Sequence, residues 1–94
     1  MKFAFLIMGN FDPAKDSAAI GSDTAQIIGV SSIRQACEVA ETLIESGIDC
    51  IELCGAFGAT GARAVIDFTR NRVPVGYVTH LPEQDELYNA VFAD

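Results

Sequence analysis

The sequence predicts a single α/β domain built on a mainly parallel sheet of about four strands, with two to three helices. Short apolar runs of strand length alternate with stretches of helical periodicity, which is typical of strand-helix-strand units. No repeat or linker divides the chain, and 94 residues suffice for one core only. We therefore expect residues 1–94 to form one domain in the order strand, loop or hairpin, strand, helix, strand, helix, strand, helix.

The amino-terminal third predicts two main strands separated by a long loop. Residues 2–8 (KFAFLIM) are almost continuously apolar, as in a central strand covered on both faces. Residues 9–24 are rich in Gly, Asp, Pro, Ser and Asn, which favours a loop. Within this loop, Asp12-Pro13 is typical of one helical turn, and residues 17–20 are the candidate for a short strand. Residues 25–30 (AQIIGV) predict the next main strand.

A helix is predicted after the serine pair at residues 31–32. Ser32 and Gln35 have the spacing of a capping box, and Gly47 suits the left-handed residue that ends a helix. The apolar positions that recur on one face of this helix are Ile33, Ala36, Cys37, Ala40, Leu43 and Ile44. We assign Cys37 to core packing.

The carboxyl-terminal half repeats the alternation. Its predicted elements are a strand at 48–54 (IDCIELC), a glycine-rich turn at 55–60, a helix at 61–69 and a strand at 73–79 (VPVGYVT). We expect Ala64, Val65 and Phe68 to face the core from that helix. Pro82 and the acidic residues after it open a last helix, whose apolar side consists of Leu87, Tyr88, Val91 and Phe92.

Charge and cysteine content exclude several classes of protein. The net charge of −7 and the dispersed arginines argue against binding nucleic acid or an anionic membrane. No apolar run reaches the roughly 18 residues of a membrane span, and we expect a cytoplasmic protein. Three cysteines without a C-x-x-C spacing fit reduced thiols better than disulfides.

The apolar content predicts self-association. Half of the residues are hydrophobic, and the mean hydropathy is +0.29. So short a chain cannot easily hide this much apolar surface from water. We therefore expect a homodimer or a larger homo-oligomer, in which a partner copy closes an apolar face of the sheet.

The carboxyl ends of the strands are where we expect a ligand, because loops and helix amino-termini converge there in parallel sheets. The turn from Gly55 to Gly61 leaves a strand and enters a helix, and Arg63 follows in the first helical turn. Such a turn favours a small anionic metabolite, whereas the alternative is glycines that serve a tight turn only. The predicted ligand-binding residues are Asn10, Asp12, Gly55, Gly58, Gly61 and Arg63.

Glu52, His80 and Cys54 are the candidate catalytic residues. Glu52 alternates with Cys50 and Cys54 along one strand, so the three side chains share a face, and an unpaired buried carboxylate there would be costly. His80, the only histidine, follows a strand end and suits acid-base chemistry. Cys54 stands where a thiolate nucleophile would be favoured.

Each of these residues has a structural alternative. Glu52 could be a hydrogen-bonded structural residue, His80 a loop or capping residue, and Cys54 a small buried hydrophobe. With Asp12, they offer ligand types that suit zinc, but no spacing signature supports this, and we predict no metal site. The sequence identifies no cofactor.

Three phrases resemble a family of small uncharacterised prokaryotic α/β proteins, a domain of unknown function. They are MGNFDPAKD near the start, IELCGAFGATGA in the middle and VPVGYVTHLPEQDEL near the end. The resemblance covers nearly the whole chain and implies a compact cytoplasmic α/β protein. It implies no catalytic residue.

Three functions remain open from the sequence. The first is a homo-oligomeric module that binds a small anionic metabolite at the strand carboxyl ends. The second is an enzyme that uses Glu52 and His80 as an acid and base pair, with or without Cys54, on a carbonyl or carboxylate substrate. The third is a structural or assembly protein without a ligand site.

Overall fold

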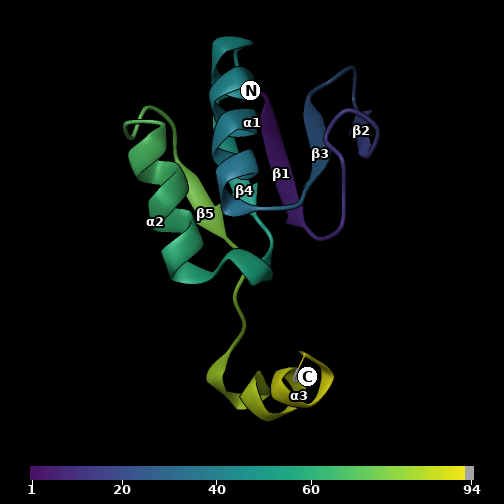
Figure 1. Cartoon of the computed structure of the whole chain (residues 1–94), viewed down its shortest axis with the longest axis vertical. Helices are drawn as coiled ribbons and strands as arrows, with labels where there is room; N and C mark the ends of the chain where they lie inside the picture. The colour runs from purple at the N-terminus through teal and green to yellow at the C-terminus, as the bar shows by residue number, and fades with distance from the viewer. Residues whose placement is uncertain (93–94) are drawn as a thin grey trace.

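A five-stranded, mostly parallel sheet forms the centre of the domain in the computed structural model, which describes residues 1–92 (Figure 1). The strands are β1 (Phe3–Met8), β2 (Ser17–Ile20), β3 (Ala25–Val30), β4 (Cys50–Leu53) and β5 (Val75–Tyr77). Their spatial order is β2-β3-β1-β4-β5. The predicted α/β fold is confirmed, and the short strand at residues 17–20 adds the fifth member.

Strand β1 is central, as its continuous apolar run predicts, but the expectation that it is covered on both faces is wrong, because both covering helices lie on one side of the sheet (Figure 1). It pairs in parallel with β3 on one side and with β4 on the other, and β4 pairs in parallel with β5. Only β2 runs antiparallel, beside β3 at the sheet edge. The carboxyl ends of β1, β3, β4 and β5 therefore meet at one edge of the sheet.

Helices α1 (Ile33–Glu45) and α2 (Gly58–Phe68) cover the same face of the sheet (Figure 1). Both helical crossovers step across the sheet in the same direction, so right-handed connections place both helices on one side. Strand alternation turns Leu6, Ile51 and Leu53 toward these helices, and all three are fully buried. Cys37 of α1 is buried in the same core, as predicted.

The start of α1 follows the predicted capping chemistry. The Ser32 side chain accepts a hydrogen bond from the Gln35 backbone N–H at 3.0 Å. Gln35 Oε1 accepts one from the Ser31 N–H at 2.7 Å, one residue earlier than the reciprocal bond of a standard capping box. These bonds use two donors that the helix itself cannot pair.

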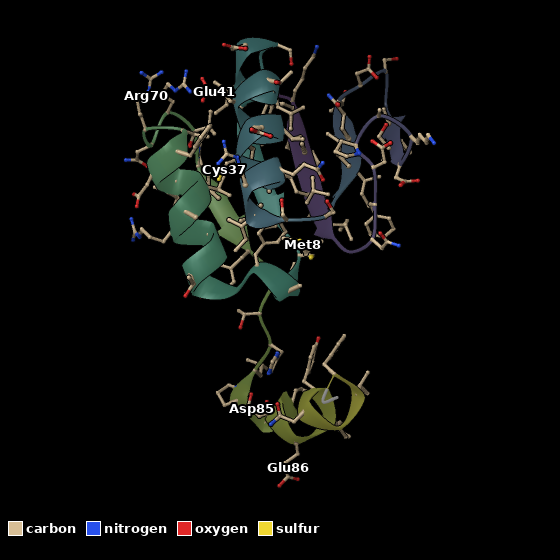
Figure 2. The ribbon with its side chains drawn as sticks, viewed as in Figure 1. Met8, Cys37, Glu41, Arg70, Asp85 and Glu86 are labelled. Atoms are coloured by element: carbon tan, nitrogen blue, oxygen red, sulfur yellow. The ribbon has the colours of Figure 1, made fainter. Side chains whose placement is uncertain are left out.

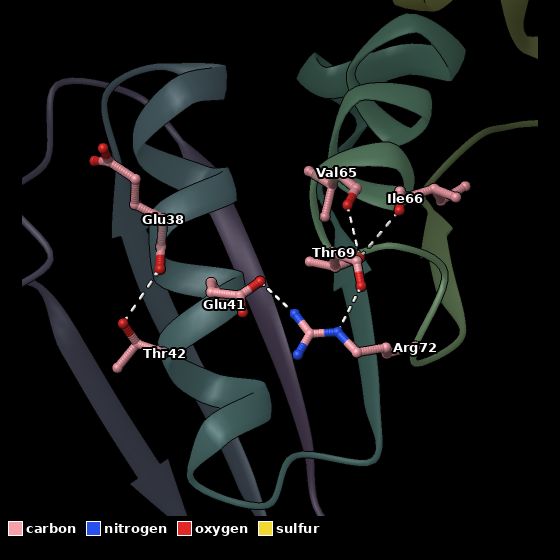
Figure 3. Close-up of polar contacts among 7 residues, drawn as sticks. All are labelled: Glu38, Glu41, Thr42, Val65, Ile66, Thr69 and Arg72. Carbon is pink, nitrogen blue, oxygen red and sulfur yellow. Dashed lines mark hydrogen bonds and ion pairs between the residues drawn. The ribbon is translucent and has the colours of Figure 1, made fainter.

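A polar network ties α1 to the end of α2 (Figure 3). Arg72 forms an ion pair with Glu41 of α1, and its Nε donates to the Thr69 carbonyl at 2.7 Å. The Thr69 hydroxyl donates to the Val65 carbonyl at 2.7 Å, so this buried threonine is satisfied. The network fixes the turn that leads into β5.

Two details of the helix after β4 differ from the prediction. The helix begins at Gly58 rather than Gly61, after a 3₁₀ turn at Gly55–Phe57. Phe68 does not face the core and is 49% exposed, because the buried stripe follows Ala62, Val65 and Thr69 instead. The stripe ends on Thr69, whose hydroxyl finds a carbonyl partner and whose burial turns Phe68 outward.

The sheet face opposite the helices carries an apolar surface that we call the open patch. It consists of Phe3, Phe5, Ala18, Ile20, Ala25 and Ile27, from the adjacent strands β1, β3 and β2. A shallow depression of about 310 Å³ lies over these side chains. Ile20 is 71% exposed and Ile27 is 46% exposed, so this half of the sheet is uncovered.

Helix α3 (Asp85–Phe92) stands away from the sheet (Figure 1). The chain leaves β5 through residues 78–81, makes a 3₁₀ turn at Pro82–Gln84 and enters α3 beyond the carboxyl ends of the strands. Every residue of α3 is exposed, including the apolar side predicted from the sequence. The helix was expected, and the sequence left open whether its apolar side docks on this subunit or on another; within residues 1–92 it does not dock on this subunit.

Candidate functional site

Three backbone hydrogen bonds hold the loops together at the carboxyl edge of the sheet. The Gly9 N–H donates to the Val30 carbonyl at 2.9 Å, and the Cys54 N–H donates to the Leu6 carbonyl at 3.0 Å. The Val78 N–H donates to the Leu53 carbonyl at 2.8 Å. The loops after β1, β4 and β5 therefore begin side by side, as expected for parallel strands.

Cys54 links the ends of β1 and β4. Its Sγ accepts a hydrogen bond from the Met8 N–H at 3.2 Å, and the side chain is half-buried against the core. The Cys54 sulfur therefore makes a structural contact at the carboxyl edge of the sheet. Sequence reasoning placed Cys54 correctly at a strand end but did not foresee this bond.

Two of the glycines from Gly55 to Gly61 have a local structural role. Gly58 has a φ of +61°, which only glycine adopts without strain. A Cβ on Gly61 would lie 2.9 Å from the Phe57 Cβ, and one on Gly55 would lie 3.4 Å from the Val78 carbonyl oxygen. Gly58 and Gly61 therefore have structural reasons to be glycine, whereas Gly55 has ordinary contact distance to its neighbour.

The predicted anion-binding side chains are separated. Arg63 points along α2, where its Nη1 lies 4.0 Å from Asp67 Oδ1, and both side chains are largely exposed. Asp12 organises its own loop, because its Oδ1 accepts from the Ala14 N–H at 3.0 Å and its N–H donates to Asp16 Oδ2 at 2.8 Å. This is the predicted turn at Asp12-Pro13, and Asn10 is exposed in the same loop.

Glu52 lies on the sheet face opposite the helices, as strand alternation predicts. It is half-buried, and its Oε1 sits where a side chain at Gly76 of the neighbouring strand would begin, 2.3 Å from that ideal Cβ position. Glycine at position 76 therefore gives the carboxylate room. Burial, with the Glu52 charge adding to it, raises the pKa of the Cys50 thiol on the same face.

His80 belongs to the α3 segment rather than to the sheet. Its Nε2 lies 2.7 Å from Asp85 Oδ1, and its ring stacks on Tyr88 with centroids 3.9 Å apart and planes 9° apart. Tyr88 in turn stacks on Phe92 at 5.7 Å. Within residues 1–92, no hydrogen bond or ion pair joins His80 to Glu52.

The model of a family of unknown function, DUF6506, matches residues 1–93. The chain belongs to this DUF6506 family. No curated protein and no solved structure matches it. The family assignment confirms an uncharacterised domain and assigns no activity to any residue.

The part of the DUF6506 chain that the structure describes offers no ready metal centre. Among residues 1–92, no three His, Cys, Asp or Glu side chains come close enough together to hold an ion. No helix within this range has the length and apolarity needed to cross a membrane.

The features that sequence reasoning missed in this DUF6506 chain lie on its surface. Figure 2 shows α3, with its labelled Asp85 and Glu86, apart from the body that holds Met8 and Cys37. The His80, Tyr88 and Phe92 stack could have been anticipated only in part, from the spacing of four residues between the last two. A groove of about 610 Å³ between α1 and the β2-β3 edge left no signal in the sequence.

Proposed function

We propose that the DUF6506 chain works as a self-associating module, a homodimer or a larger homo-oligomer, that uses the open patch as its contact surface. The observation that carries the proposal is the composition of this patch: six apolar side chains from three adjacent strands, with no charged residue among them. Contiguous apolar surfaces of this kind mark protein contacts in soluble proteins.

The position of the patch supports the same proposal. Both sheet-covering helices lie on the other face, so neither α1 nor α2 shields these side chains. Phe3 and Phe5 pack edge to face at 6.1 Å and project a rigid aromatic surface. Strand β2 at the edge is fully exposed, so a partner reaches the patch without displacing any part of the fold.

Light scattering of the wild-type chain at micromolar concentrations tests this function. We expect a mass of at least twice 10.0 kDa. Ile27→Asp should reduce the mass to that of the monomer, because it places a charge in the patch. Ser17→Asp is the matched control: Ser17 is exposed on the same sheet edge but pairs with Ile28, whose side chain faces α1. A wild-type chain that stays monomeric, or an Ile27→Asp chain that stays associated, would contradict the proposal.

Binding of a small anionic metabolite at the strand carboxyl ends is the second candidate. The observation that favours it is the convergence of three loops, which the backbone hydrogen bonds of Gly9, Cys54 and Val78 hold side by side. The separation of Arg63 and Asp12 limits the number of side chains that a ligand there can engage at once. An acid-base pair of Glu52 and His80 has less support, since the Nε2 of His80 already contacts Asp85.

A further inference from the structure

Two apolar surfaces of this chain are exposed. Within residues 1–92, one is a sheet surface that no helix covers, and the other is the side of a helix that packs on no sheet. The open patch is a flat sheet surface, and α3 is a helix whose apolar side, Leu87, Tyr88, Val91 and Phe92, lies away from the sheet (Figure 1); Tyr88 stacks on His80 of its own segment. Leu87 is 62% exposed and Val91 is 74% exposed. We infer that α3 of one copy covers the open patch of a second copy, and that two copies exchange their α3 helices reciprocally. This inference rests on the proposed function and names the segment that makes the contact.

The dimensions of the two surfaces match. Eight helical residues span about 12 Å, and three adjacent strands span about 10 Å from the first to the third. Helix α3 therefore lies across β1, β3 and β2 with its whole apolar side in contact. The side chains that form the two surfaces are aliphatic and aromatic, with the Tyr88 hydroxyl as the polar group among them, so close packing buries mainly carbon.

Charge distinguishes the open patch from the other surface that a helix could enter. The groove between α1 and the β2-β3 edge is lined by Asp23 and Glu38, and the α3 segment itself carries Glu83, Asp85 and Glu86. Like charges would repel each other in that groove. None of the six residues of the open patch is charged, and Glu52, the register partner of Phe5 at its margin, is half-buried, so the acidic segment meets less repulsion there than in the groove.

Geometry favours a second copy over the chain's own helix. Strand β5 lies at the opposite edge of the sheet from β2, and α3 lies beyond the carboxyl ends (Figure 1). The patch occupies the other half of the sheet, around the first residues of β1 and β3. A partner related by a two-fold axis, with its strands antiparallel to these, brings its α3 to this amino-terminal half. Reciprocal exchange then covers both open patches and the apolar sides of both α3 helices.

Two variants and their mixture test the exchange. Val91→Asp places a charge on the apolar side of α3, and Ile20→Asp places a charge in the open patch. Both positions are exposed, so both chains should give the circular dichroism spectrum of the wild-type fold. Each variant alone should be monomeric, since both of its contacts are lost. An equimolar mixture should regain dimers, because α3 of the Ile20→Asp chain can still cover the patch of the Val91→Asp chain. The controls Asn89→Asp, on the polar side of α3, and Ser17→Asp should remain dimeric.

The outcomes separate this inference from the function on which it rests. A monomeric wild-type chain would overturn both. Dimers that Ile20→Asp breaks and Val91→Asp leaves intact would keep the open patch as the contact surface and overturn the α3 exchange. A mixture that stays monomeric would also overturn the exchange. A dimer that only Ser17→Asp dissociates would show that the contact surface is the groove beside α1, and it would overturn both proposals.

Discussion

Phe11 shapes the loop at the end of β1 by covering two glycines. A Cβ on Gly29 would lie 2.6 Å from the Phe11 Cβ, and a Cβ on Gly9 would lie 2.6 Å from its Cε2. The phenyl ring thus rests directly on the backbone, where any side chain would exclude it. Packing of Phe11 is therefore a sufficient reason for glycine at both positions, and no ligand is needed to account for them. The same contact fixes the course of residues 9–16 over the sheet.

Replacement of Gly29 tests this contact. Gly29→Ala should lower the free energy of unfolding by about 1–3 kcal/mol, because the added methyl group overlaps the aromatic ring. In a Phe11→Ala background the same replacement should cost much less. Urea denaturation of the four chains gives the coupling energy, and strictly additive effects would show that Phe11 does not lie on Gly29.

The partner of His80 decides whether an acid-base pair with Glu52 is reasonable. The structure places the imidazole 2.7 Å from Asp85 and stacks it on Tyr88. We therefore expect Asp85→Asn to move the imidazole NMR signals of His80, and Glu52→Gln to leave them unchanged. The opposite pattern would restore the enzyme hypothesis that the sequence suggested.

The buried thiols predict how stability depends on pH. Burial, with a smaller contribution from Glu38, raises the pKa of the Cys37 thiol in the folded chain. The folded state thus holds this proton more tightly than the unfolded state. Its contribution to stability is complete below the ordinary thiol pKa of about 8.5 and is lost as the pH rises through the higher folded value.

Denaturation at about pH 7 and about pH 10 measures this loss. The free energy of unfolding should fall between the two conditions, and it should fall less in Cys37→Ala, which lacks the titrating group. An equal fall in both chains would mean that Cys37 does not contribute.

At the scale of elements, the sequence predicted correctly those helices and strands whose formation depends on residues close together in the chain. The Ser32 cap, the helical spacing after it and the apolar run of β1 gave correct elements, because capping and burial act over a few residues. The start of α2 was missed because Phe57 and Gly61 pack against each other, a contact that glycine spacing does not reveal. Phe68 was misplaced because a polar residue, Thr69, is buried next to it.

For the candidate site, too, the sequence predicted positions along a strand but not the orientation of side chains on other elements. Alternation along β4 correctly placed Glu52 on the same face as Cys50, whereas Cys54 follows the strand and packs against the core, and the order of the strands was left open. The direction of Arg63 and the contact of His80 with Asp85 depend on how a helix and a linker are oriented in space. No pattern of residue types along the chain specifies those orientations.

Anion binding is predicted at the turn between β4 and α2. If phosphate or sulfate binds there, it should raise the melting temperature beyond the effect of chloride at equal ionic strength, and Arg63→Ala should weaken this shift. Lys15→Ala, in the loop after β1, is a control that removes a positive charge away from the turn. Thermal scans with no specific shift would leave the glycines with their structural roles only.

At the scale of the whole molecule, the distribution of apolar surface is the central fact. The helices bury one sheet face, while the other face and α3 are left uncovered, which accounts for the high apolar content of so short a chain. Burial of a large apolar side chain is worth about 1.5–3 kcal/mol. Covering both surfaces in an assembly would therefore add substantially to the stability of each copy.

The most direct test of the account is an isotope-filtered NMR experiment on a mixture of labelled and unlabelled chains. Helix exchange predicts nuclear Overhauser effects between copies, from the methyl groups of Leu87 and Val91 to those of Ile20 and Ile27. The absence of such effects between copies would contradict helix exchange, and so would effects between these methyl groups that arise only within one copy.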